Sequence, residues 1–89
     1  MPEEPAYSSA EEPQLVQWAK VGDMQAFEEL VARYRDRIYV RAYSIMRNET
    51  LAVDLSQNAW VKAWQRLDQF HGEASFPTWL SRIVTNLCL

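Results

Sequence analysis

The sequence predicts an all-α domain, folded as a compact bundle of three or four helices. Over most of its 89 residues, apolar side chains recur at steps of three and four positions, which is the spacing of one buried helix face. Only two glycines and four prolines occur, and three of the prolines lie in the first thirteen residues. Because glycine and proline are the main breakers of regular structure, long helices should fill the rest of the chain.

The first ten residues are expected to be a flexible lead-in, and the helical domain is expected to span residues 11–89. The lead-in has too few apolar side chains to offset the entropy lost on ordering. A first helix should begin near Glu12, with Pro13 tolerated in its first turn, and should end at Gly22, whose missing side chain suits a left-handed terminus. Its expected buried face consists of Leu15, Val16, Trp18 and Ala19.

A second, longer helix is expected from an N-cap at Asp23 to about Met46. Arg33, Arg37 and Arg41 fall four residues apart on one face of this helix, where like charges repel one another. Such a row is more often a solvated surface than a binding site, and either carboxylates and water or an acidic partner would neutralise it. The expected core face holds Phe27, Leu30, Val31, Tyr34, Ile38, Ala42 and Ile45.

Thr50 is the expected N-cap of a third helix, which should run from Leu51 to about Leu67. Small residues on one face of a helix let its neighbours approach closely, so this helix is expected at the centre of the bundle. The face in question consists of Ala52, Leu55, Ala59, Ala63 and Leu67.

A polar loop over residues 69–74 should connect the third helix to a fourth. Ser75 is the expected N-cap of this last helix, which opens at Phe76 and carries Pro77 in its first turn. The helical pattern is still strong at Leu89 and no stop signal follows it, so we expect the natural chain to continue beyond this residue.

The average charge of the chain hides a basic half. The net charge is −3 and the pI is about 5.0, which by themselves argue against a nucleic-acid binder. Residues 1–30, however, hold one lysine against seven acidic residues, whereas residues 31–89 hold eight basic residues against five acidic ones. The carboxyl-terminal part therefore carries the positive charge that attracts phosphates.

Several classes of protein fit the sequence poorly. The single cysteine, Cys88, has no second thiol or clustered histidine with which to form a disulfide or a metal site, which favours a reducing compartment such as the cytoplasm. No apolar run approaches the roughly 20 residues that a membrane span needs. Since no glycine-rich phosphate loop, activated nucleophile or facing carboxylate pair is visible, the sequence predicts neither an enzyme nor a cofactor.

The segment from Asp54 to Asn86 places two aromatic-rich helices around one short polar loop. A base that leaves its stack needs a pocket, flat side chains to lie against and cations for the phosphates. This segment offers a loop that could form the pocket, aromatic side chains and basic residues, so it predicts binding to single-stranded DNA. Trp18 and Trp60 are interpreted as core packing, whereas Trp79, just after the loop, can pack with one face and meet a base with the other.

Three ordered blocks of residues carry a family resemblance. The blocks are Gly22-Asp23 with Ala26–Tyr34, then Asp54–Gln57, then Gly72–Phe76 with Thr78–Leu80 and Arg82-Ile83. In these blocks the sequence resembles the region-two domain of bacterial RNA polymerase sigma factors, most closely the extracytoplasmic-function (ECF) group. The resemblance implies a transcription initiation factor that binds core RNA polymerase and melts the minus-ten promoter element, with no catalysis of its own.

The resemblance also implies a polymerase-binding face on the third helix. In this family the helix presents polar residues to a coiled coil of the polymerase's largest subunit. Family members usually carry an acidic residue where this chain has Asn58, so the contact here lacks one charge-assisted hydrogen bond. The implied polymerase-binding residues are Asp54, Gln57, Asn58 and Val61.

A DNA-binding loop over residues 70–75 follows from the same resemblance, since in the family this loop receives a base flipped from the non-template strand. Gly72 allows close backbone approach, and the amides at the start of the following helix favour a phosphate or a base carbonyl. His71 stands where an arginine is common, which weakens the attraction for phosphate. The implied DNA-binding residues are Lys62, Phe70, His71, Gly72, Ser75, Phe76, Trp79, Arg82 and Asn86.

Two other functions stay open at this point. A helical bundle that binds only proteins would keep a polymerase or anti-sigma contact without reading a promoter, and Asn58 and His71 leave room for it. A helix-turn-helix reader of duplex DNA fits less well, because no short second helix follows a three- or four-residue turn. The same surfaces bind anti-sigma proteins in the family, so the expected partners are core RNA polymerase, single-stranded minus-ten promoter DNA and an anti-sigma factor.

Overall fold

The computed structural model describes residues 6–89, and every regular element within this range is a helix, which confirms the all-α prediction. The first half of the predicted lead-in, residues 1–5, lies outside the described residues. In chain order the elements are the 3-10 turn η1 (Tyr7–Ser9), α1 (Glu12–Lys20), α2 (Met24–Met46), α3 (Glu49–Gln65), the 3-10 turn η2 (Leu67–Gln69) and α4 (Phe76–Cys88).

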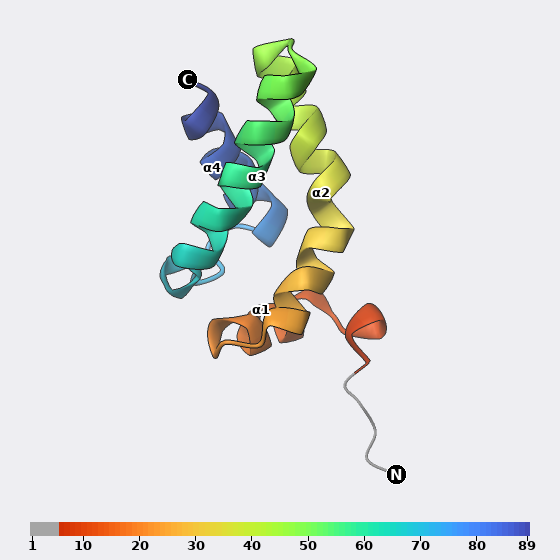
Figure 1. The fold of residues 1–89 in the computed structure, drawn as a ribbon. Coiled ribbons are helices and arrows are strands. Elements are labelled where there is room, and N and C mark those ends of the chain that lie inside the picture. The colour runs from red at the N-terminus through yellow and green to blue at the C-terminus, as the bar shows by residue number, and fades with distance from the viewer. Residues whose placement is uncertain (1–5) are drawn as a thin grey trace.

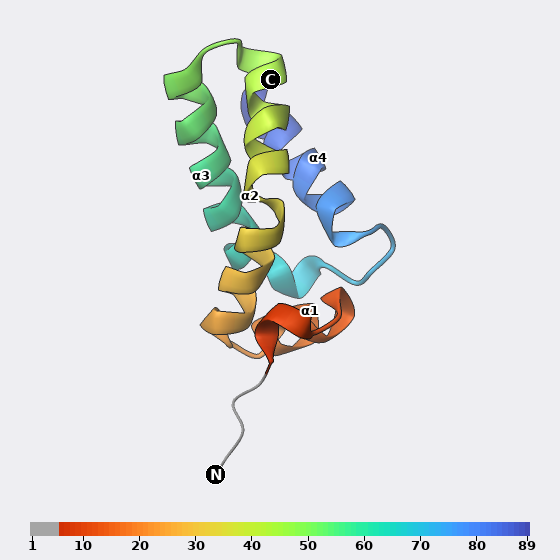
Figure 2. The ribbon, with the colours of Figure 1, turned by 90° about the vertical axis from the view of Figure 1, so that its right-hand side faces the viewer.

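Three of the helices lie side by side, and the fourth crosses one end of them (Figure 1). The helix α3 runs back along α2, and α4 packs against both, while α1 lies across the end where α2 begins. Figure 2 shows that α1 and the segment between α3 and α4 share this end of the molecule. The sequence predicted α3 at the centre, but α2 is the helix that packs against all three others.

The core forms where the apolar faces of the four helices meet. The small face of α3 is confirmed, since Ala52, Ala59 and Ala63 are fully buried and let α2 and α4 approach closely. Trp18 and Trp60, interpreted as core residues, are half-buried and pack against the edge of the core. The largest fully buried side chains are Leu15, Leu30, Ile38, Phe76, Leu80 and Val84.

Two of the three predicted N-caps are confirmed. Asp23 accepts hydrogen bonds from the amides of Gln25 and Ala26 at 3.1 and 3.3 Å. Ser75 accepts one from the amide of Thr78 at 3.3 Å.

The third helix begins earlier than predicted. Asn48 rather than Thr50 caps it, since the Asn48 side chain accepts from the amide of Leu51 at 2.9 Å. The helix α2 ends at Met46, and Arg47, in a left-handed conformation with φ at 54°, separates it from Asn48. Asparagine is one of the strongest N-caps, so the helix begins at Glu49 and encloses Thr50 in its first turn.

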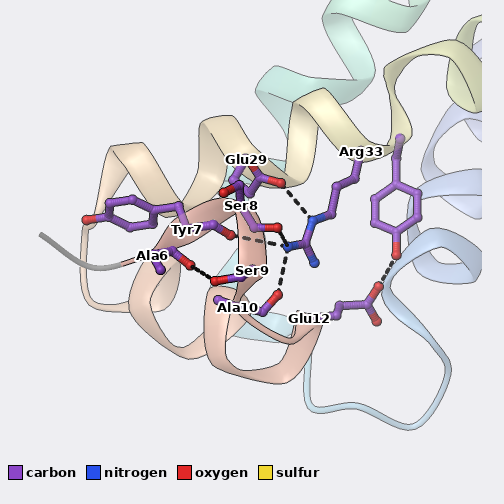
Figure 3. Close-up of polar contacts among 9 residues, drawn as sticks. Ala6, Tyr7, Ser8, Ser9, Ala10, Glu12, Glu29 and Arg33 are labelled. Carbon is purple, nitrogen blue, oxygen red and sulfur yellow. Dashed lines mark hydrogen bonds and ion pairs between the residues drawn. The ribbon is translucent and has the colours of Figure 1, made fainter.

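Residues 6–10, expected to be flexible, are held against the domain by Arg33 (Figure 3). One terminal nitrogen of the Arg33 guanidinium donates to the carbonyl oxygens of Tyr7, Ser8 and Ala10 at 3.2, 3.2 and 2.7 Å. Its Nε donates to the Glu29 carboxylate at 2.8 Å. The Tyr7 hydroxyl also donates to the Asp23 carboxylate at 2.8 Å, and its ring packs against Trp18, so side chains of the domain hold the segment from more than one side.

We predict that Arg33→Met lowers the free energy of unfolding by about 1–3 kcal/mol, because a charged donor to several carbonyls is lost. The matched control is Arg37→Met, which removes an exposed arginine one turn further along α2 and should change stability by less than about 0.5 kcal/mol. Urea unfolding of both variants measures the difference. Equal losses would contradict the role given to Arg33.

A second side-chain contact joins α1 to α2, because the Tyr34 hydroxyl donates to the Glu12 carboxylate. Burial raises the pKa of Tyr34 to about 12, and the hydrogen bond to Glu12 and the negative charge of the Glu12 carboxylate both raise it as well. The positive charges of Arg33 and Arg37 oppose this shift. The folded state therefore favours the neutral phenol.

Comparing the wild type with Tyr34→Phe as a function of pH tests this contact. Because the pKa in the folded state is raised from 10.0 to about 12, the advantage of the wild type is fully present below pH 10 and is lost as the pH approaches 12. Urea unfolding across the alkaline range measures the advantage. A difference in stability that stays constant up to pH 12 would rule out the linkage.

Candidate nucleic-acid interface

The loop between η2 and α4 is anchored at both ends by buried phenylalanine rings. Phe70 is 8% exposed and Phe76 is 0% exposed, and their rings meet edge to face with centroids 5.7 Å apart. The half-buried ring of Trp79 lies 5.1 Å from Phe70 and 5.8 Å from Phe76. These three aromatic rings, here called the aromatic anchor, fix where the chain leaves the core and where it returns.

The residues between the two phenylalanines face solvent. His71, Gly72, Glu73 and Ser75 are exposed, and Ala74 is half-buried. Gly72 has φ at 83°, a conformation that residues with a side chain rarely adopt. The loop therefore presents backbone and small polar groups, while the rings of Phe70 and Phe76 support it from below.

A lysine from α1 fixes the start of the loop. The Lys20 ammonium donates to the carbonyl oxygen of Phe70 at 2.7 Å, across fifty positions of sequence. This carbonyl follows the last turn of η2, so the bond ties α1 directly to the point where the loop begins. The contact could not be predicted from the sequence, because nothing in the local pattern around Lys20 refers to residue 70.

A cavity of about 610 Å³ lies between α1 and the loop. Two carboxylates, an ammonium and an imidazole line it, from Glu12 and Glu73, Lys20 and His71 respectively. Its wall is formed by residues 70–76 of the loop and by Glu12, Pro13, Val16, Gln17 and Lys20 of α1.

A second hollow, of about 440 Å³, lies between α2 and α4. Its lining is polar and includes two arginines but no acidic residue. The residues that line it are Arg41, Thr78, Ser81, Arg82, Thr85 and Asn86. We refer to this hollow as the α4 groove.

The predicted DNA-binding residues divide between these places. Phe70, His71, Gly72, Ser75 and Phe76 surround the loop cavity, whereas Arg82 and Asn86 line the α4 groove. Trp79 belongs to the aromatic anchor. Lys62 lies half-buried near the end of α3, outside both hollows.

Residues outside the predicted DNA-binding set also lie at these sites. Thr78, Ser81 and Thr85 recur at three- and four-residue steps on α4, and this helical spacing was a signal that could have found them. Gln17 and Lys20 line the loop cavity, and Arg41 completes the α4 groove from another helix. Their positions depend on packing between helices and not on spacing within one.

The polar residues predicted to bind polymerase lie exposed along α3. Asp54, Gln57 and Asn58 face solvent, and Val61 is 55% exposed. Two further apolar residues of α3, Leu51 and Val53, are also exposed, by 44% and 41%. The helix thus offers hydrogen-bonding groups interspersed with apolar side chains, while its alanine face packs inside.

Within residues 6–89 no helix is long and apolar enough to cross a membrane. Over the same part of the chain, no group of three histidine, cysteine or acidic side chains is placed to hold a metal ion. Burial raises the pKa of the Cys88 thiol, and the nearby positive charge of Arg41 partly opposes the shift.

Residues 30–89 match the family described as Sigma-70 region 2. The ECF RNA polymerase sigma factor SigW of Bacillus subtilis is 38% identical over 74 residues, which cover 83% of this chain and 40% of SigW. The RNA polymerase sigma-H factor of Pseudomonas aeruginosa is 37% identical over 73 residues, which cover 82% of this chain and 38% of that protein. The chain therefore spans about two fifths of the length of these relatives.

Solved structures share the same fold. An engineered region 2 of sigmaE, determined by NMR in complex with GTAAAA, superimposes with a TM-score of 0.76 at 31% identity and covers 99% of this chain and 86% of its own. CnrH, in complex with the cytosolic domain of CnrY, superimposes with a TM-score of 0.77 at 36% identity. That match covers 84% of this chain and 49% of the CnrH chain.

The variant Lys20→Met tests whether α1 holds the loop. It leaves the Phe70 carbonyl without its partner, which should cost about 1–3 kcal/mol of stability and speed hydrogen exchange of the Gln69 and Phe70 amides, which bond to the carbonyls of Arg66 and Leu67 at the start of the loop. Lys62→Met is the matched control, because the Lys62 side chain makes no hydrogen bond within the described residues. If the Gln69 and Phe70 amides exchange equally fast in both variants, the Lys20 contact does not position the loop.

Proposed function

Since this chain belongs to the Sigma-70 region 2 family, we propose that it is the part of an ECF sigma factor that binds core RNA polymerase and reads the minus-ten promoter element as a single strand. The match to region 2 of sigmaE, a domain solved in complex with GTAAAA, carries this proposal. The match extends over 99% of this chain, so it includes the loop and both hollows described above.

In the proposed mechanism, one base leaves its stack and lies against the loop between η2 and α4. Extruding a base costs a few kcal/mol, so stacking and hydrogen bonds at the loop must return about as much. Trp79 offers the part of its ring that the aromatic anchor leaves exposed, and residues 71–75 offer backbone groups next to the start of α4. Because the loop is already anchored, binding orders little further chain.

The remaining predicted residues contribute charge and hydrogen bonds to the bound strand. Lys62 and Arg82 supply cations for backbone phosphates, and the Asn86 side chain supplies an amide that can both donate and accept. His71 on the exposed loop adds a weaker phosphate contact than an arginine would. We assign these roles from the family resemblance together with the positions of the side chains.

The polymerase contact is assigned to the exposed polar face of α3. Asp54, Gln57 and Asn58 offer acceptors and amides to a coiled coil of the polymerase, and Val61 adds an apolar contact. In this proposal the domain performs no catalysis, because the polymerase carries out the chemistry of transcription. Its site of action is then the cytoplasm, where polymerase and promoter meet.

A second candidate function is binding to an anti-sigma protein without promoter reading. The exposed apolar residues Leu51, Val53 and Val61 on α3 favour it, since apolar side chains among polar ones are typical of protein interfaces. The related CnrH was solved in complex with the cytosolic domain of CnrY. A domain of this second kind would bind protein partners through α3 and would show no preference among DNA sequences.

The proposal can be tested without knowing the promoter sequence. Single-stranded oligonucleotides that carry a randomised hexamer are selected for binding to the domain, and the bound fraction is sequenced. We expect the wild type to enrich one sequence, and we expect Asn86→Ala to reduce that preference by about 1–3 kcal/mol, because a base contact is lost. Asn58→Ala makes the same chemical change on α3, so it should keep the DNA preference and weaken binding to core RNA polymerase.

Two results would contradict the proposal. One is that the wild type enriches no sequence even at low salt, where nucleic-acid binding is strongest. The other is that Asn58→Ala and Asn86→Ala lose DNA preference equally, since the effect would then not depend on the face that carries the substitution. Retained polymerase binding with no enrichment would favour the protein-binding alternative.

A further inference from the structure

The α4 groove carries an excess of positive charge that no acidic side chain within residues 6–89 neutralises. Neither Arg41 nor Arg82 forms an ion pair within residues 6–89, and none of the six lining residues is acidic. The whole of α4 contains no aspartate or glutamate. A hollow with two guanidinium groups and no carboxylate favours an anionic ligand.

Arg41 is held at the groove by two successive hydrogen bonds that pass through the Thr85 hydroxyl. Its Nε donates to Thr85 Oγ1 at 3.2 Å, and the Thr85 hydroxyl in turn donates to the Ser81 carbonyl at 2.8 Å. These two bonds orient the guanidinium toward α4 and leave its terminal nitrogens without a bonded acceptor among the described residues. A guanidinium fixed in this way can donate to two oxygens of one phosphate.

The three arginines of α2 therefore differ in what they contact. Arg33 is committed to Glu29 and to the carbonyls of residues 7, 8 and 10, and Arg37 is exposed. Arg41 is the member of the row that faces α4, and its charge also reaches Cys88 in the last turn of that helix. The row is thus not a uniform solvated surface.

The remaining lining groups also suit a phosphodiester. Thr78 and Ser81 add hydroxyls, which donate readily to phosphate oxygens, while Asn86 at the far end of the groove keeps the base contact proposed above. The groove begins at Thr78, one turn after the N-cap Ser75, and extends to Asn86, a distance of about 12 Å along the helix. A strand with one base at the loop can therefore continue along α4 into the groove.

We propose that Arg41 of α2, together with the hydroxyl groups of α4, forms a phosphate-binding subsite for the backbone of single-stranded DNA. This inference rests on the proposed function, because the strand that enters the groove is the one whose base the loop receives. The subsite contributes affinity for any sequence and does not read bases.

The salt dependence of binding tests the subsite. A labelled single strand that contains GTAAAA and a strand of scrambled sequence are titrated with the 89-residue chain at 50 to 200 mM salt. Each phosphate contact on a single strand adds about 0.7 to the slope of log K against log salt concentration. Arg41→Gln should therefore reduce the slope by about 0.7 and weaken binding several-fold for both strands alike.

Two further variants separate the subsite from general effects. Arg41→Lys keeps the charge and should keep most of the slope. Arg35→Gln removes an exposed arginine from the same helix but outside the groove, so it should leave the slope at the wild-type value. Circular dichroism establishes that each variant is folded.

The outcomes distinguish the subsite from the proposed function. If the wild type prefers one strand but Arg41→Gln leaves the slope unchanged, or if Arg35→Gln reduces it equally, the subsite is refuted and the proposed function stands. If Arg41→Gln alone reduces the slope but neither strand is preferred, the subsite is supported and base reading by the loop is weakened. Absence of binding to either strand at 50 mM salt would overturn both.

Discussion

The aromatic anchor is the constraint on which the candidate interface depends. Phe70 and Phe76 are both buried, and their rings pack against each other and against Trp79. The chain between them must therefore leave and re-enter the core at fixed points, and Lys20 fixes the first of these points again through the Phe70 carbonyl. The loop loses its conformational entropy when the domain folds, so a ligand that binds there need not order it.

The long helix α2 contacts the other elements through several polar side chains, two of which are arginines with different partners. Arg33 binds the segment before α1, whereas Arg41 reaches the polar side of α4. Tyr34, next to Arg33, binds Glu12 at the start of α1. The helix α2 thus packs against α1 near the loop and contributes Arg41 to the α4 groove, while the polar face of α3 stays exposed.

Local patterns in the sequence were enough to predict most of the fold. Apolar spacing indicated the four helices, and strong side-chain caps indicated the starts of α2 and α4, since the physical cause of each lies within a few residues. The start of α3 was misplaced because Asn48 and Thr50 are both good caps and only the turn at Arg47 decides between them. The contacts of residues 7–10 with the domain were not predicted, because their partners Asp23 and Arg33 lie more than ten positions away along the chain.

The site was predictable only in part, because several of its contacts join residues that are far apart in the sequence. Family resemblance pointed to the loop and to residues of α3 and α4, but spacing alone could not place Lys20 beside Phe70 or Arg41 beside Thr85. Such contacts arise when helices pack, and a single sequence carries no record of which faces meet. The burial of Phe70 and Phe76 likewise became clear only from the packed structure, and it makes their rings a support for the loop.

The most direct measurement is a map of amide chemical-shift changes when the ¹⁵N-labelled domain is titrated with single-stranded DNA. If the anchored loop and the α4 groove receive the strand, the largest changes fall on residues 71–75, on residues 78–86 and on Arg41, while residues 54–61 of α3 change little. Changes confined to the exposed face of α3, or absent from the loop at saturating DNA, would contradict the account.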